Sequence, residues 1–321
     1  MKQFTIGFNG TDKIDRFLYE TEKREKYIHD IFTECPGIET FMTVCNDARK
    51  NNYMKNCENF LEETKNSKIK ITILFNDVDY YLKYDPNELD EYAKKISKAI
   101  EKYNIYGLVT TNYTIAEFIH NKYTDVQIIT SCNLPLYNLN HYKKLMDLGI
   151  TMINPPRDAS RNIPLLKMLK ENGFKIRLLI NESCSINCLN YGTCGCTLTN
   201  RKCICNEELL KRCYVLPRWL NILDEYVDVY KLTTRAKKYI SSVFHPLDVY
   251  IERKDCQLNE LFLDPSDGNE YTINTSEIPD TLLYCDKFHC EECGVCNQLY
   301  EKYPILKGKF KPYLYQYPKQ D

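Results

Sequence analysis

The sequence predicts an α/β fold, a (β/α) barrel of the triosephosphate-isomerase type with a cysteine-rich insertion and a small cysteine-rich C-terminal appendage. Over the first 235 residues, short β-rich runs alternate with helical patterns. Strands that alternate with helices pair in parallel through right-handed crossovers, and eight such units close a barrel. An open doubly wound sheet is the alternative, but Asn9-Gly10-Thr11-Asp12 follows the first expected strand in place of a glycine-rich phosphate loop.

Eight short runs rich in β-branched and aromatic residues are the expected strands. They are Phe4–Phe8, Ile28–Phe32, Ile69–Phe75, Tyr106–Thr110, Val126–Thr130, Thr151–Ile153, Phe174–Ile180 and Val227–Leu232. Helical patterns lie between them at Glu88–Lys102, Thr114–Asn121, Leu139–Leu148, Asn162–Asn172 and Glu207–Glu225. We expect Gly149 and Gly173 to end two of these helices and Pro217 to break the last one.

The chain length suits one large domain or a barrel with a small addition, since 43% of its 321 residues are hydrophobic. We expect the barrel to span residues 1–240, with a cysteine-rich loop at 184–213, and the appendage to span 241–321. The tail no longer shows the alternation of strands and helices, and it contains a strong turn signal, Asp264-Pro265-Ser266-Asp267-Gly268.

The charge and hydropathy patterns narrow the class of protein. A net charge of −1 gives no overall electrostatic footprint for nucleic acid, although it leaves local basic patches open. No apolar run is long enough for a transmembrane helix, and the N-terminal one is too short for a signal peptide. We therefore expect a cytoplasmic protein without a membrane partner.

The sixteen cysteines are the outlier of the composition. In a reducing compartment, clustered cysteines are more often metal ligands than disulfides. Five stand apart and are expected to be buried thiols: Cys35, Cys45, Cys57, Cys132 and Cys256. The other eleven fall into two groups.

The first group follows the seventh expected strand and consists of Cys184, Cys188, Cys194, Cys196, Cys203, Cys205 and Cys213. The second consists of Cys285, Cys290, Cys293 and Cys296, with His289 as a further possible ligand. Its CxxCxxC core resembles the local spacing of ferredoxin-type loops, but four thiolates suit zinc as well as an iron–sulfur cluster. A cysteine of the second group is also a candidate to complete a centre held by Cys184 and Cys188. The CxxxCxxC motif of radical S-adenosylmethionine enzymes is absent from the first group.

Polar residues follow the expected strands, where barrel enzymes place their active sites. They are Asn9, Asn76, Asp77, Thr110, Thr111, Ser131, Cys132, Asn133, Asn154, Arg157, Asp158, Asn181, Glu182 and Arg235. The ordinary polarity of loops is the alternative explanation. Arg157 and Arg235 are suited to clamping a carboxylate or phosphate, and Glu182 is the best placed acid–base candidate.

Four segments, taken in order, resemble motifs of the peptidase U32 family, and the resemblance covers roughly residues 1–250. They are Ser131-Cys132-Asn133-Leu134-Pro135-Leu136-Tyr137-Asn138, Pro156-Arg157-Asp158-Ala159-Ser160, the loop of Cys184 and Cys188 with Tyr191-Gly192-Thr193-Cys194, and Lys231-Leu232-Thr233-Thr234-Arg235. The sequence departs from the family at Asn181-Glu182, where a His-Gly pair is usual, at Asp158, and at Thr233-Thr234. These departures indicate a divergent branch of the family.

The resemblance implies a barrel-like protein of a family named as peptidases. Several members instead carry a cysteine-bound iron–sulfur cluster, here expected to be one or two 4Fe–4S centres, and take part in oxygen-independent hydroxylation. The candidate catalytic residues are Glu182, Arg157, Arg235 and Lys231. The candidate cofactor-binding residues are Asn181, Ser131 and Asn133.

Three functions follow from these observations. The leading hypothesis is a redox enzyme that modifies a small molecule, a peptide or RNA, with an anionic group held by Arg157 and Arg235. The second is hydrolysis, but none of the five histidines stands among the strand-end residues, and no HExxH helix exists. The third is a non-catalytic binding or partner subunit stabilised by zinc or by an iron–sulfur cluster.

Overall fold

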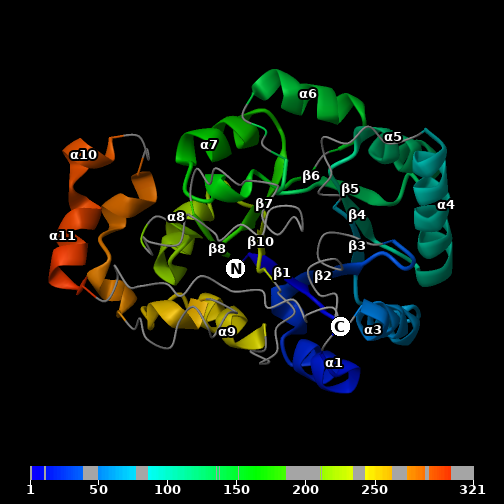
Figure 1. The fold of residues 1–321 in the computed structure, drawn as a ribbon, viewed down its shortest axis with the longest axis horizontal. Coiled ribbons are helices and arrows are strands. Elements are labelled where there is room, and N and C mark those ends of the chain that lie inside the picture. Colours follow the sequence, from blue (N-terminus) through cyan, green and yellow to red (C-terminus); the bar gives the residue numbers. More distant parts are fainter. Residues whose placement is uncertain are drawn as a thin grey trace, which may run out of the picture.

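A computed structural model describes residues 2–10, 12–38, 50–76, 86–134, 136, 138–150, 152–185, 210, 212–233, 243–261, 273–285 and 289–304. Within these ranges, eight parallel strands close into a barrel in the order β1-β2-β3-β4-β5-β6-β7-β10, and β10 pairs with β1 (Figure 1). The predicted barrel is confirmed, and the open sheet is wrong.

The eight strands lie where the sequence predicts them, with ends that differ by at most two residues. They are β1 Gln3–Gly7, β2 Ile28–Glu34, β3 Ile71–Phe75, β4 Gly107–Thr110, β5 Gln127–Thr130, β6 Met152–Ile153, β7 Lys175–Leu179 and β10 Val229–Lys231. The register between the last and first strands pairs Gln3 with Val229 and Thr5 with Lys231, which closes the ring.

Helices surround the barrel in the alternating order that parallel strands require (Figure 1). They are α1 Ile14–Glu22, α3 Lys50–Thr64, α4 Pro86–Tyr103, α5 Tyr113–Lys122, α6 Leu139–Asp147 and α7 Ile163–Glu171. Asparagine side chains cap three of them: Asn112, Asn138 and Asn162 each accept a bond from a backbone N–H of the first turn. Gly149 and Gly173 follow α6 and α7 with positive φ, which confirms them as helix ends.

The predicted helix over Glu207–Glu225 is wrong before Pro217 and is confirmed only as a short helical stretch after it. Arg212–Tyr214 forms β9, which pairs antiparallel with β8, Asn181–Ser185. A 3₁₀ turn at Pro217–Trp219 and the short helix α8, Leu220–Leu223, follow. Pro217 breaks the helical pattern as expected, and the residues before it find backbone partners in the strand that leaves the barrel.

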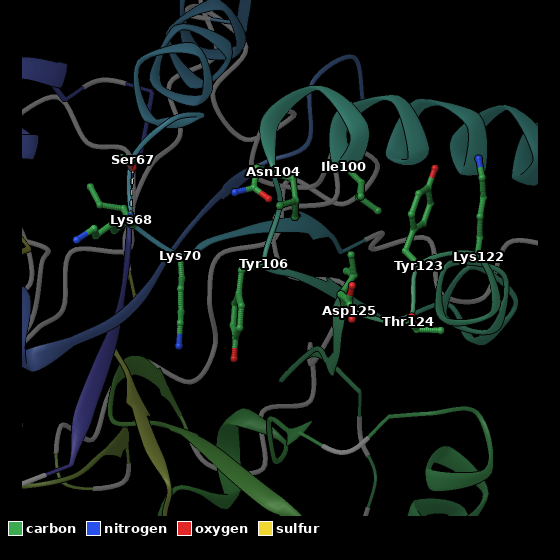
Figure 2. Close-up of a pocket in the computed structure, with 13 residues that line it drawn as sticks. Ser67, Lys68, Lys70, Ile100, Asn104, Tyr106, Lys122, Tyr123, Thr124 and Asp125 are labelled. Atoms are coloured by element: carbon green, nitrogen blue, oxygen red, sulfur yellow. Dashed lines mark hydrogen bonds between the residues drawn. The ribbon is translucent and has the colours of Figure 1, made fainter.

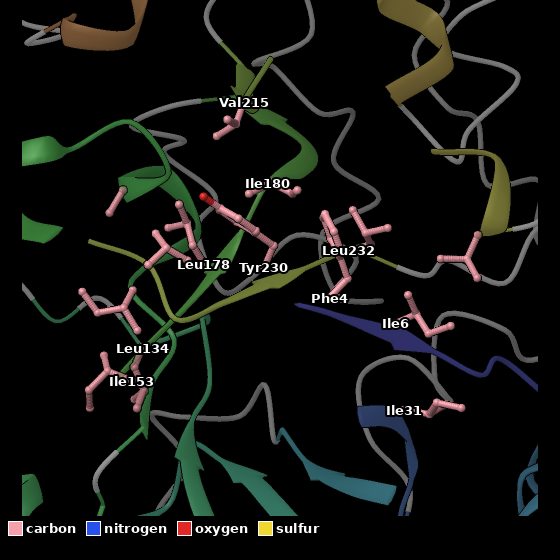
Figure 3. Packing of buried hydrophobic residues seen from close by; sticks show 14 of the residues in the cluster. Phe4, Ile6, Ile31, Leu134, Ile153, Leu178, Ile180, Val215, Tyr230 and Leu232 are labelled. Atoms are coloured by element: carbon pink, nitrogen blue, oxygen red, sulfur yellow. The ribbon is translucent and has the colours of Figure 1, made fainter. Parts of the chain in front are cut away.

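Two apolar layers account for the packing. The outer layer fills the space between the strands and the helices, and Figure 3 shows the part of it around β1, β7 and β10. The inner layer fills the barrel and consists of Phe32, Leu74, Val109, Ile129, Met152 and Val229. Successive residues of a strand face opposite sides of the sheet. A residue two positions from an inner-layer residue therefore also points into the barrel.

The C-terminal segment packs on the barrel through the same outer core, which contains Leu247, Leu258, Leu283 and Tyr300. It includes α9 Phe244–Glu252, α10 Cys290–Cys293 and α11 Val295–Lys302, with α10 and α11 at one edge of the molecule (Figure 1). Short 3₁₀ turns at Leu258–Leu261, Thr275–Glu277 and Asp280–Tyr284 connect them. The predicted boundary at residue 240 lies outside the described residues.

Polar contacts also tie this segment to the barrel side. The Arg24 guanidinium donates to both carboxylate oxygens of Asp248, at 2.6 and 2.7 Å. The Tyr250 hydroxyl donates to the carbonyl oxygens of Ile180 and Val215, which stand just beyond β7 and β9. Among the described residues, no helix is both long enough and apolar enough to cross a membrane.

Gly149 and Gly173 form a matched pair for testing the helix ends. A Cβ at Gly149 would lie 2.3 Å from the His120 ring, whereas a Cβ at Gly173 meets nothing within 4 Å. Both glycines have positive φ, so each change to alanine strains the backbone by about 1–2 kcal/mol. We expect Gly149→Ala to lower the free energy of unfolding by clearly more than Gly173→Ala in denaturant titrations. Equal losses would show that His120 moves away without cost.

Candidate active site at the mouth of the barrel

A ring of polar side chains crowns the inner apolar layer at the carboxyl ends of the strands. Each member stands two residues beyond an inner-layer residue and therefore faces the same way, into the barrel mouth. The members are Glu34, Asn76, Thr111, Ser131, Asn154 and Lys231, and we call them the mouth ring. Five of them, all but Asn76, are buried, with at most 5% of the residue surface exposed. Barrel enzymes bind their substrates at this end.

Two members of the mouth ring have buried acceptor atoms without a partner among the described residues. These atoms are Oδ1 of Asn76 and Oδ1 of Asn154. The amide nitrogen of Asn154 donates to the carbonyl oxygen of Thr130 at 2.6 Å, which holds the side chain in place. Because an unmade buried hydrogen bond costs about 1–3 kcal/mol, such atoms mark where a ligand or water would bind.

Lys231 is the basic member of the mouth ring. Only 5% of its surface is exposed, and its ammonium lies 4.7 Å from the centre of the Phe32 ring. Burial lowers the pKa of Lys231, and the nearby Arg177 guanidinium lowers it further, whereas the Cys132 thiol raises it. Asp30 and Glu182 are close enough to oppose that shift. Perturbed, buried lysines in a barrel mouth are candidates for direct contact with substrate.

A buried ion pair fills the barrel below the inner layer. Oδ2 of Asp30 lies 3.3 Å from the Arg177 guanidinium, and neither side chain is exposed. The hydroxyls of Thr5 and Thr72 donate to the same carboxylate, and Nδ1 of His29 lies 2.8 Å from it. Burial alone would raise the pKa of Asp30, but Arg177, His29 and Thr5 outweigh it and hold that pKa well below its usual range. This network was not predicted from the sequence, because Asp30 and Arg177 stand inside expected strands.

A second acidic group near the mouth was also missed. Glu34 ends β2 and is buried, and burial raises the pKa of Asp12 to about 6. Both carboxyl groups lie near Tyr53 of α3, whose pKa rises mainly through burial. The sequence indicated these two acidic residues only weakly. Asp12 belongs to a stretch that resembles an ordinary turn, and Glu34 lies beyond the predicted end of its strand.

The predicted polar residues lie at or beside the mouth where the structure describes them. Ser131 is buried and its hydroxyl accepts from the backbone N–H of Asn133. The backbone N–H of Arg157 donates to the Cys132 carbonyl oxygen, which joins the loops after β5 and β6. Glu182 is buried on β8, close enough to Lys231 to affect its pKa. Asp77 and Arg235 lie outside the described residues.

Asn181 has a positioning role in the described structure. Its amide nitrogen donates to the Leu261 carbonyl oxygen, and its Oδ1 accepts from the backbone N–H and the hydroxyl of Thr233. These bonds hold the segment after β10 beside β8. These bonds do not test the cofactor-binding role expected of Asn181, which stays a prediction.

The first cysteine group is described only at its two ends. Across β8 and β9, Asn181 lies opposite Tyr214 and Ser185 opposite Arg212, so the segment with Cys184 runs beside the segment with Cys213. Cys213 is fully buried and is not in a disulfide. Cys188, Cys194, Cys196, Cys203 and Cys205 lie outside the described residues, as does the side chain of Cys184.

The second cysteine group lies around α10 and α11. Cys285, Cys293 and Cys296 are not in disulfides, and the side chain of Cys290 is outside the described part. Burial raises the pKa of Tyr214 to about 12, and Cys296 is near enough to add to the rise. The second group therefore lies close to β9, which carries Cys213. Within the described ranges, no three His, Cys, Asp or Glu side chains come together in a way that could hold a metal.

A cavity of about 580 Å³ lies at the opposite, amino-terminal end of the barrel (Figure 2). Its walls are the segments that lead into β3, β4 and β5, including Lys68, Lys70, Asn104, Tyr106 and Asp125. Figure 2 shows Lys70 and Tyr106 side by side, and the Lys70 ammonium lies 4.9 Å from the Tyr106 ring centre. Because catalytic groups of such barrels stand at the other end, we do not place the active site here.

Comparisons with known proteins agree with the barrel topology and extend no further. No protein-family model and no curated protein matches the chain. One similar solved structure is the U32 peptidase Mk0906, which is 11% identical, with a TM-score of 0.48 over 74% of this chain and 94% of that chain. A phosphoribosylanthranilate isomerase from Thermotoga maritima is 6% identical, with a TM-score of 0.44 over 79% and 98%. The homocysteine methyltransferase MmuM from Escherichia coli is 10% identical, with a TM-score of 0.40 over 79% and 97%. Likeness at this level carries no argument about activity.

Removing one partner of the buried ion pair should be costly. Asp30→Asn leaves the Arg177 charge uncompensated, and we expect the free energy of unfolding at pH 7 to fall by about 3–5 kcal/mol. The folded-state pKa of Asp30 is depressed, so its contribution is present above the unfolded pKa of about 3.9 and is lost as the pH falls below that value. Denaturant titrations from pH 7 to pH 2 measure both effects. The double variant Asp30→Asn/Arg177→Met should recover part of the loss, and an equal loss in both would contradict a dominant charge effect.

Lys231→Met should stabilise the protein, because it replaces a buried ammonium by an apolar side chain of similar length. We expect a gain of about 0.5–2 kcal/mol at pH 7. The folded-state pKa of Lys231 is lowered, so the unfolded chain binds more protons between the two pKa values, and the stability of the unmodified protein rises with pH there. The advantage of the variant should therefore shrink towards pH 10. Lys175→Met, at an exposed position of β7, is the control and should change little.

Proposed function

We propose that this protein is an enzyme that binds its substrate in the barrel mouth and acts on it beside a thiolate-bound metal centre. One observation carries the substrate site: the buried acceptor atoms Oδ1 of Asn76 and Oδ1 of Asn154 have no hydrogen-bond partner among the described residues, and they lie in the same ring of side chains as Lys231. A purely structural barrel end would pair these groups with one another or fill the place with apolar side chains.

The chain's own residues divide the work of binding. The inner layer, which includes Phe32 and Leu74, forms an apolar floor that excludes water and so strengthens polar contacts above it. Asn76 and Asn154 offer acceptors for hydroxyl or amino groups of the substrate. Arg157, half-buried on the loop after β6, is placed to hold an anionic group.

Glu182 is the acid–base group of the proposal. It stands on β8, immediately beyond the mouth, with 4% of its surface exposed. Its influence on Lys231 places the two side chains within electrostatic range of each other. A carboxyl group in that position is suited to moving a proton between the substrate and the mouth.

The metal centre would be held by Cys184, Cys188, Cys213 and a fourth cysteine. The antiparallel pairing of β8 with β9, which runs the segments of Cys184 and Cys213 side by side, supports this choice. The nearness of Cys296 to Tyr214 supports the second group as the source of the fourth ligand. An iron–sulfur cluster supplies electron transfer when bound, and the protein supplies binding and orientation.

The resemblance to the U32 family supports the finer part of the proposal. It favours an iron–sulfur enzyme of the oxygen-independent hydroxylase type, or a related modification of a small molecule, peptide or RNA. Asn181-Glu182 and Thr233-Thr234 stand where that family has other residues, which favours a substrate different from those of its known members.

Metal analysis of anaerobically purified protein tests the redox part. We expect iron and acid-labile sulfide, together with the visible absorption of an iron–sulfur cluster. Cys184→Ser should lose all three signals, whereas Cys256→Ala, which changes a half-buried cysteine outside both groups, should keep them. Stoichiometric zinc without iron, or full iron retention in Cys184→Ser, would refute the proposed centre.

A further inference from the structure

We propose that Lys231 forms an imine with the carbonyl carbon of an aldehyde or ketone bound in the barrel mouth. The inference rests on the substrate site proposed above and is independent of the metal centre. It assigns the substrate a chemical class and Lys231 a covalent role.

The strand geometry aims Lys231 into the mouth. Val229, two residues earlier, belongs to the inner layer. Tyr230 points to the outer core, where its hydroxyl donates to Asp224 at 2.8 Å. Lys231 therefore faces inward at the carboxyl end of β10, which is the end of the barrel where chemistry takes place.

The surroundings of the ammonium are unusual for a structural lysine. Among the described residues, Nζ of Lys231 forms no hydrogen bond and no ion pair, and it lies over the face of the Phe32 ring, 4.7 Å from the ring centre. The fully buried carboxylate deeper in the barrel, Asp30, is already bonded to Thr5 and Thr72 and paired with Arg177. A buried lysine normally secures a carboxylate partner, since a desolvated ammonium is costly.

The same surroundings favour the neutral amine, which is the nucleophilic form. Burial lowers the pKa of Lys231, and the Arg177 guanidinium below it acts in the same direction. A desolvated lysine next to another cation is a recognised arrangement for activating an amine toward carbonyl compounds. Phe32 lies against the amine and keeps one side of it dry.

The reaction balances without an external oxidant or reductant. The Nζ lone pair attacks the carbonyl carbon, so that an N–C bond forms while the C=O π bond becomes a hydroxyl. The carbinolamine then loses water, which carries away the carbonyl oxygen and both hydrogens of the neutral amine and leaves a C=N bond. Once protonated, the imine withdraws electrons from the neighbouring carbon, which makes a bond there easier to break.

Borohydride trapping tests this directly. The full-length protein, purified anaerobically with its metal content recorded, is incubated separately with pyruvate, glyoxylate and glyceraldehyde and then reduced. We expect at least one probe to give a single saturable adduct, which peptide mapping places on Lys231. Lys231→Arg keeps the charge but cannot form the imine and should lose the adduct, while Lys175→Arg should keep it.

Two outcomes overturn the inference: no adduct on Lys231 with any of the three probes, or labelling spread over lysines in proportion to their exposure. Mapping of the unmodified protein decides this even where a variant folds poorly. Trapping at Lys231 in protein that lacks iron would overturn the redox proposal alone. Iron-loaded protein without trapping would overturn the imine alone.

Discussion

The closure of the barrel between β1 and β10 is the constraint on which the site depends. Pairing of Gln3 with Val229 and of Thr5 with Lys231 brings the last strand of the ring beside the first, from more than two hundred residues away in the sequence. A shift of one residue would turn Val229 out of the inner layer and Lys231 into the outer core. Only the observed register between β1 and β10 places both Val229 and Lys231 on the inner side of the barrel.

The sequence predicted the barrel well because alternation of strands and helices leaves few topologies. The strand ends were within two residues, and Gly149 and Gly173 ended their helices as left-handed turns do. The first half of the helix predicted over Glu207–Glu225 did not form, because Arg212–Tyr214 pairs instead with the distant strand β8, a partner that no local pattern reveals. Pairing between distant segments is what sequence patterns express least.

The site was predictable in outline and not in its interior. Asn76, Thr111, Ser131 and Asn154 were recognised, because polar residues directly after a strand stand out. Asp30 and Arg177 were not recognised, because each lies within an expected strand and their ion pair forms only when the barrel brings the two strands together. The metal role of the cysteines stays a prediction, since most of the first group lies outside the described residues.

The buried pair of Asp30 and Arg177 limits the routes by which a small molecule could reach the barrel mouth. Together with the inner layer, it fills the bore of the barrel between the amino-terminal end and the mouth. A substrate bound in the mouth, as proposed above, would therefore enter and leave the barrel from the carboxyl-terminal end of the strands.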